Sequence, residues 1–134
     1  MPAYNFQAQF VPMILEGRKF HTVRKIRKNP TKSGDWLYLY VGMRTKHCEQ
    51  ICSTRVLKID PILILPFEQR LVAGISVPID EFAYHDGFDS VADFFKFFER
   101  YKNERLEDFE IVWWNPQRMY PPGDYQRFLE VHHG

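Results

Sequence analysis

The chain has 134 residues and a net charge of +1 at pH 7. That length suits a single domain over 1–134 with one buried core. Hydrophobic residues make up 45% of the chain and aromatic residues 16%, which is too apolar for a disordered protein. Charged residues interrupt the apolar stretches too often for a membrane span, so we expect no membrane segment.

The N-terminal segment and the cysteines favour a cytoplasmic location. The first ten residues, MPAYNFQAQF, lack the basic-then-apolar layout of a secretory signal, and the chain shows no lipidation motif. Cys48 and Cys52 are so close in sequence that a bond between them would constrain the unfolded chain little. We therefore expect both cysteines to be free thiols.

Charge is unevenly distributed along the chain. Residues 17–58 hold eleven Lys and Arg against two acids, a net charge of +9, whereas residues 59–134 hold seven against fourteen, a net charge of −7. If the fold keeps the first segment on one surface, that surface attracts anions. If the two halves interleave, much of the charge is paired internally. The sequence leaves both arrangements open.

The first half of the chain predicts one short helix followed by strands. A helix over 10–16 ends at Gly17, because Phe10 and Ile14 recur at helical spacing and glycine suits a C-cap. Strand-like runs follow over 21–26, 36–42, 51–65 and 71–79. Pro61 breaks or bulges the third run. These runs predict a curved sheet.

The second half predicts one clear helix and a last strand. Over 89–102 the apolar side chains fall on one helical stripe, which we expect to pack in the core, and Ser90 with Asp93 forms a capping box. A strand is expected over 109–114. Residues 115–134 then form a turn-rich C-terminal extension, in which 124–131 is a candidate helix. This order favours an α+β fold, a small β-barrel of about five or six mostly antiparallel strands with two main helices.

The segment EGRKFHTVR, residues 16–24, holds the first candidate site. Side chains of a strand alternate faces, so Lys19 and Thr22 meet only if Lys19 lies in the turn before the strand. Thr22 and Arg24 share a face, whereas His21 is expected to face away. These groups offer a hydroxyl nucleophile, a guanidinium that binds anions, and an amine that acts as a base once its pKa falls from about 10.4 toward 7 to 8. A strand residue between surface cations is the alternative.

This segment and two later ones resemble the ASCH domains, relatives of the PUA RNA-binding fold. The shared G-x-K-x-x-T-x-R element is matched by Gly17, Lys19, Thr22 and Arg24. The order of GRKFHTVR, SGDWLYLYVG and FAYHDGFDSVADFFKFF follows the family over residues 6–114. The resemblance implies a PUA-like β-barrel whose helices close a cleft lined by the shared element.

Some small members of that family are amidohydrolases that deacetylate acetylcytidine. The resemblance implies that Thr22 is the nucleophile and Lys19 its activator. It places Asp86 where the family has a glutamate as the third catalytic residue. An aspartate is one methylene shorter and reaches less far, and Asp-Gly before a helix is also ordinary turn chemistry. Catalysis by Lys19, Thr22 and Asp86 is one expectation, and a structural turn at Asp86 is the other.

ASCH domains are also proposed to bind RNA, and some are reported to cleave it, so a ribonuclease is a further enzymatic alternative. The leading expectation is a basic cleft that binds RNA or a modified nucleoside or nucleotide. The candidate binding residues are Arg18, Arg24, Lys25, Arg27, Lys28 and Arg44. A solvated basic surface is the alternative. The side chains of Trp36, Tyr38 and Tyr40 share one strand face, which either stacks on bases or packs in the core.

The remaining candidates are less specific. His47, Cys48 and Cys52 lack the spacing and the second Cys/His pair of a zinc site, so we expect no metal and no cofactor. A protein-interaction module is a third functional class. It would use the aromatic residues Trp113, Trp114 and Tyr120. The sequence does not indicate an oligomeric state.

Overall fold

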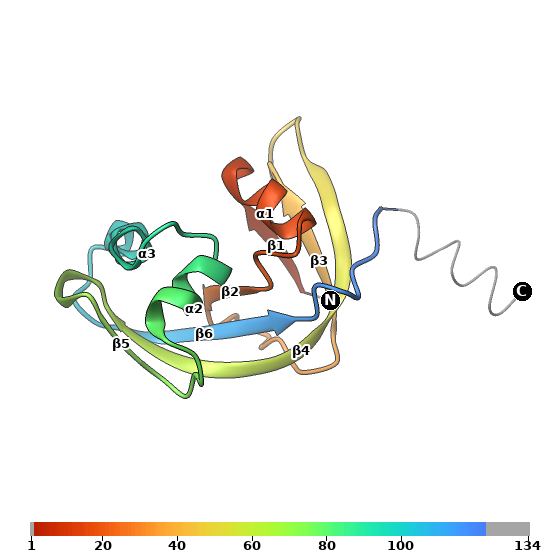
Figure 1. Cartoon of the computed structure of the whole chain (residues 1–134). Helices are drawn as coiled ribbons and strands as arrows, with labels where there is room; N and C mark the ends of the chain where they lie inside the picture. Colours follow the sequence, from red (N-terminus) through yellow and green to blue (C-terminus); the bar gives the residue numbers. More distant parts are fainter. Residues whose placement is uncertain (1, 123–134) are drawn as a thin grey trace, which may run out of the picture.

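The computed structural model describes residues 2–122 as an α+β domain (Figure 1). Its strands are β1 (Ala3–Phe6), β2 (His21–Lys25), β3 (Trp36–Val41), β4 (Glu49–Leu65), β5 (Arg70–Ala73) and β6 (Leu106–Trp114). Its α-helices are α1 (Val11–Leu15), α2 (Ile79–His85) and α3 (Val91–Phe98). Short 3-10 turns precede α1 and follow β4 and α3. The candidate helix over 124–131 lies outside the described residues.

One curved, mixed sheet organises the fold. Its strands pair in the order β1-β3-β4-β6-β2, and β5 adds to β4. The pair of β1 with β3 is parallel, and the other pairings among the described residues are antiparallel. β4 is 17 residues long and bends beneath the helices (Figure 1). Register shifts between Val56 and Lys58 and between Ile62 and Ile64 account for this bend, because an extra residue on one strand increases its twist.

The expected barrel is not closed. Within residues 2–122, the end strands β1 and β2 form no ladder with each other. Instead, Arg24 donates a hydrogen bond to the carbonyl oxygen of Asn5 at 2.6 Å, and Arg27 donates to that of Ala3 at 3.1 Å. Guanidinium groups thus satisfy the carbonyls of β1 where a closed barrel would use a strand.

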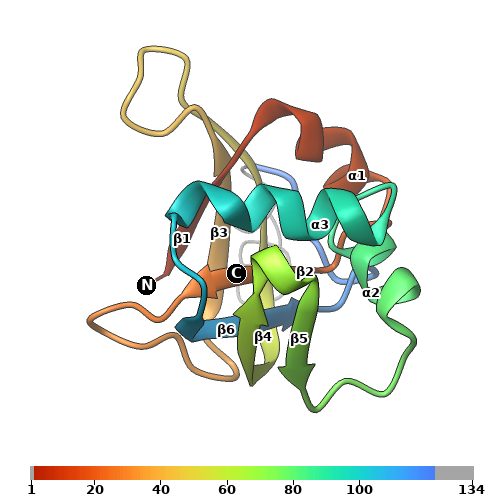
Figure 2. The ribbon, with the colours of Figure 1, turned by 90° about the vertical axis from the view of Figure 1, so that its left-hand side faces the viewer.

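The three α-helices lie on the concave side of the sheet (Figures 1 and 2). Helix α3 packs inward as predicted, with Phe94, Phe95 and Phe98 buried. Ser90 caps this helix by accepting a hydrogen bond from the backbone N–H of Asp93 at 3.0 Å, which is one half of the predicted capping box. The short helix α1 also forms as predicted.

The run over 71–79 was expected to be one strand, and this prediction is confirmed only for residues 71–73 and is wrong for the rest. The strand β5 ends at Ala73, and helix α2 begins at Ile79, directly after Pro78. Proline before a first turn that carries Asp80 and Glu81 is typical of a helix start. Strand β1 was not predicted at all.

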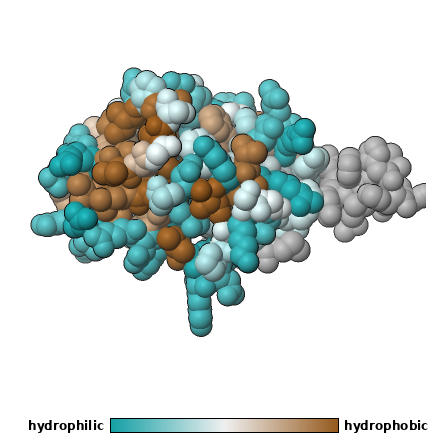
Figure 3. All heavy atoms as spheres, turned by 90° about the horizontal axis from the view of Figure 1, so that it is seen from below, coloured by the Kyte–Doolittle hydropathy of each residue, from teal (hydrophilic) through white to brown (hydrophobic). Residues whose placement is uncertain are grey.

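The aromatic residues of β3 and β6 differ in how far they are buried. On β3, Leu37 and Leu39 are fully buried, while the alternate face with Trp36 is only partly covered. Trp114 is 1% exposed and belongs to the core, so it is not available to a partner protein. The underside of the molecule mixes apolar with polar side chains (Figure 3). No helix within the described part of the chain is long and apolar enough to cross a membrane.

Candidate functional site

A pocket of about 250 Å³ collects the residues of the GRKFHTVR segment with the ends of α2 and α3. Charged and hydroxyl side chains in its lining are Lys19, Thr22, Arg24, Asp86, Arg100 and Tyr101. Phenylalanine rings form most of the remaining wall. The volume lies just below the range of about 300 to 1,000 Å³ that is usual for drug-sized ligands, so the pocket suits one flat ring system.

Lys19 lies outside the strand, as the parity argument required. The chain turns at Gly17, whose φ of +81° favours glycine, and β2 begins only at His21. The backbone N–H of Lys19 donates to the carbonyl of Met13 at 2.9 Å, which holds the turn against α1. Its ammonium group donates to both the backbone carbonyl and the carboxylate of Asp86, the latter at 3.2 Å.

Asp86 forms the turn at the end of α2, and its carboxylate also contacts Lys19 of the pocket. It is the C-cap of α2, and it is only 2% exposed, with its carboxylate turned toward Lys19. Gly87 follows with a φ of +102°, a conformation that side chains other than glycine rarely adopt. A Cβ at that position would lie 2.7 Å from the ring of Phe10, so the turn and the pocket wall require glycine together.

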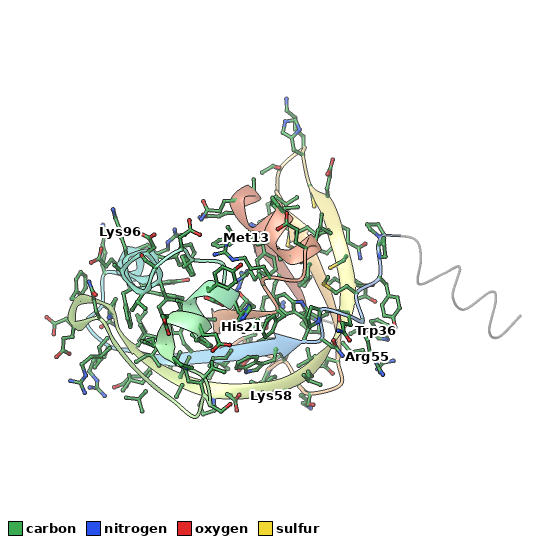
Figure 4. The ribbon with its side chains drawn as sticks, viewed as in Figure 1. Met13, His21, Trp36, Arg55, Lys58 and Lys96 are labelled. Carbon is green, nitrogen blue, oxygen red and sulfur yellow. The ribbon has the colours of Figure 1, made fainter. Side chains whose placement is uncertain are left out.

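His21 does not face away, contrary to the prediction. Its Nδ1 donates to Asp86 Oδ1 at 3.0 Å, and its ring stacks on Phe82 of α2 with centroids 4.5 Å apart. Figure 4 shows His21 near the centre of the molecule, beside α2 and β6. Burial lowers the pKa of His21, so the ring is neutral at pH 7 and carries its proton on the nitrogen that faces the carboxylate. Both faces of β2 are covered here. His21 therefore stays buried although its side chain points to the opposite face from that of Thr22.

Thr22 and Arg24 share a face and are hydrogen bonded. Arg24 Nε donates to Thr22 Oγ1 at 3.0 Å, and the guanidinium lies 4.5 Å from the ring centroid of Phe6. Burial lowers the pKa of Arg24 from its ordinary value, yet a guanidinium stays protonated at neutral pH. Among the hydrogen bonds within residues 2–122, none joins Lys19 to Thr22. The three expected catalytic residues therefore share one pocket but form no continuous chain.

Burial also sets the protonation of Lys19. It lowers the pKa of Lys19 to about 8, against the attraction of Asp86, which raises it. Roughly a tenth of the amine is then neutral at pH 7, enough to accept a proton. Arg100, which also lines the pocket, adds a third cation, and Asp86 is the only carboxylate in the lining. The pocket therefore carries net positive charge and favours ligands rich in acceptor oxygens.

The other predicted binding residues lie outside the pocket. Arg18 donates to Asp89 at 3.1 Å and packs over the ring of Tyr84, so its role is to hold α2 and the following turn. A second cavity of about 430 Å³, here called the middle groove, adjoins the pocket at Arg24. It contains the predicted residues Lys25, Arg27 and Arg44. Lys28 lies further along the chain, in the loop after β2.

Sequence reasoning missed Arg100 and Asn5, which also line the pocket. Arg100 lies 3.6 Å over the ring of Phe97, just after α3, and Asn5 belongs to the unpredicted strand β1. Neither residue carries a local signal, because packing of distant segments places both.

Within residues 2–122, no group of three or more His, Cys, Asp and Glu side chains is arranged to hold a metal ion. No protein-family model matches the chain, and searches of curated proteins and of solved structures found no match.

Proposed function

We propose that the pocket binds a nucleoside, either free or as one nucleotide of an RNA chain, in an ASCH-like cleft. One observation carries the proposal: a buried lysine and a partly buried arginine face aromatic rings inside one small pocket. Lys19 Nζ lies 5.0 Å from the ring centroid of Phe10, and the guanidinium of Arg24 lies 4.5 Å from that of Phe6. A nucleobase is flat, so it fits a small pocket with aromatic walls, and it presents carbonyl oxygens as acceptors to the two cations.

Hydrogen-bond capacity supports the same ligand class. A guanidinium has five N–H donors, and Arg24 places one on Thr22 and one on the carbonyl of Asn5. An ammonium has three, and Lys19 directs two to Asp86. The pocket thus retains N–H donors for a ligand. A pyrimidine carbonyl or a phosphate oxygen can accept hydrogen bonds from them.

One further point supports the proposal. Three residues of the shared ASCH element, Lys19, Thr22 and Arg24, line a single pocket, which agrees with the family resemblance.

Calorimetric titration with cytidine and cytidine 5′-monophosphate tests the proposal. We expect saturable binding of both, weakened at least tenfold by Arg24→Gln, because this change removes a partly buried charge and its donors. The control variant Lys58→Gln removes an exposed cation that does not line the pocket, and it should leave the affinity unchanged. Absence of binding to the parent protein, or equal losses in both variants, would refute the proposal.

Hydrolysis of N-acylated cytidine is the second candidate function, favoured by the lowered pKa of Lys19, which lines the same pocket as Thr22. In this reaction Thr22 Oγ1 attacks the acyl carbonyl carbon as its proton passes to the neutral amine of Lys19. Arg24 stabilises the oxyanion. The C–N bond then breaks, and the cytidine nitrogen takes the proton from Lys19. Water finally hydrolyses the threonyl ester to the carboxylic acid and the free hydroxyl.

This step requires Lys19 to turn from Asp86 toward Thr22, so binding is the better supported function. Chromatographic assay of N4-acetylcytidine distinguishes the two functions. Turnover that rises up to about pH 8, persists in Thr22→Ser and vanishes in Thr22→Val would establish hydrolysis. Binding without turnover by the parent protein would exclude it and leave the binding function intact.

A further inference from the structure

The loop between β2 and β3, together with β4, forms another basic cavity, which we call the loop hollow. Its volume is about 680 Å³, and Trp36 lies in its wall. The charged residues of its lining are Arg27, Lys28, Lys32, Asp35 and Arg55. Four cations therefore face one carboxylate, and Asp35 directs this carboxylate to the backbone N–H of Lys32 at 2.9 Å.

The loop that forms this hollow is fixed from both sides. The buried hydroxyl of Thr31 is hydrogen bonded to the hydroxyl of Tyr4 on β1 at 2.7 Å. On the other side, the N–H of Gly34 donates to the carbonyl of Val56 at 2.8 Å, and the N–H of Val56 donates to the carbonyl of Asp35 at 2.9 Å. The backbone that carries the loop cations is thus already ordered, so less conformational entropy is lost when a ligand binds.

Two of these cations are themselves held in place. Arg27 donates to the carbonyl of Ala3 at 3.1 Å, and Arg55 donates to that of Gly34 at 2.9 Å. The guanidinium of Arg55 also lies 4.4 Å above the ring of Trp36, and Figure 4 shows the two residues side by side. The ion pairs within residues 2–122 include neither arginine. Each keeps N–H donors for an outside anion.

The loop hollow, the middle groove and the pocket are neighbours through shared lining residues. The pocket and the middle groove share Arg24, and the middle groove and the loop hollow share Arg27. Together the three cavities are lined by nine cations against the two carboxylates of Asp35 and Asp86. A ligand with a single phosphate would contact only some of these cations.

We propose that the loop hollow binds the phosphodiester backbone of a single RNA strand, one nucleotide of which lies in the pocket. This inference rests on the proposed function and deepens it. The regularly spaced phosphates of a strand match cations that are spread over several neighbouring cavities. One face of the Arg55 guanidinium packs on Trp36, and the other face can stack on a neighbouring base. The preferred ligand is therefore an oligonucleotide, and a mononucleotide binds more weakly.

Fluorescence anisotropy with a labelled RNA octanucleotide, and calorimetry with cytidine 5′-monophosphate, test this inference. The hollow variant carries Lys28→Gln, Lys32→Gln and Arg55→Gln. The control variant carries Lys46→Gln, Lys58→Gln and Arg70→Gln, which remove the same charge from exposed residues outside the three cavities.

We expect the hollow variant to lose at least tenfold in octanucleotide affinity and to keep its affinity for the mononucleotide. The slope of log K against log salt concentration should become less negative by about two. Each phosphate contact to a single strand contributes roughly 0.7 to this slope, and the variant removes three cations. The control variant should change both affinities less than threefold. Equal losses in the two variants, or an octanucleotide that binds no tighter than the mononucleotide, would overturn the inference.

Arg24→Gln separates this inference from the proposed function. If the parent protein binds the octanucleotide no more tightly than the mononucleotide, the proposed function of the pocket stands and RNA binding by the loop hollow is refuted. If the hollow variant weakens octanucleotide binding and Arg24→Gln does not, the loop hollow is supported and the pocket function fails. If the parent protein binds neither ligand, both are refuted.

Discussion

Replacing Asp86 with asparagine should lower the pKa of Lys19 below its value of about 8. The variant keeps an oxygen acceptor for Lys19 and His21 but removes the negative charge 3.2 Å from Lys19 Nζ. At an effective dielectric constant of about 20, that separation corresponds to roughly 5 kcal/mol of attraction. One pKa unit is about 1.4 kcal/mol, so even a fraction of this attraction lowers the pKa by at least one unit.

NMR titration of the lysine 13Cε resonances measures this shift directly. The Lys19 resonance is assigned by its absence from the spectrum of Lys19→Met, and the parent protein supplies the reference titration. Because no ligand is involved, the result is independent of the proposed function. An unchanged or higher pKa in Asp86→Asn would show that Asp86 does not control the charge of Lys19.

Three further predictions concern stability and reactivity. Between pH 8 and 10.5 the free energy of unfolding of the parent should rise relative to Lys19→Met by up to about 3 kcal/mol, because unfolded lysine keeps a proton that the buried amine releases. Urea denaturation across this range checks it, and a flat difference would contradict it. Gly87→Ala should lose about 1 to 3 kcal/mol in the same assay, since its Cβ meets Phe10 at 2.7 Å; wild-type stability would refute the strain. At pH 8 a thiol reagent should label exposed Cys48 and spare Cys52, because burial raises the pKa of Cys52 to about 12; mass spectrometry that finds Cys52 labelled in the folded protein would disprove this.

Local patterns in the sequence predicted part of the site well. Strand parity correctly required Lys19 to leave the strand and placed Thr22 with Arg24, since both conclusions depend only on alternation along a few residues. The same rule was wrong for His21, because it tells which side a residue faces and not what covers that side. Helix α2 supplies that cover, and α2 was not predicted.

Features that depend on distant packing were beyond local reasoning. The two neighbours of Asp86, Lys19 and His21, lie 67 and 65 residues away in the chain. Strand β1 has only four residues, and guanidinium groups of Arg24 and Arg27 partner its backbone. The sheet consequently stays open where a barrel was expected.

Binding of cytidine 5′-monophosphate, followed through the NMR resonances of Lys19 and of the Arg24 side chain, tests the central claim most directly. We expect both resonances to shift saturably with one dissociation constant, and the affinity to fall at least tenfold in Arg24→Gln. Binding that leaves the Lys19 and Arg24 resonances in place, or no binding at all, would contradict the claim that this pocket receives a nucleotide.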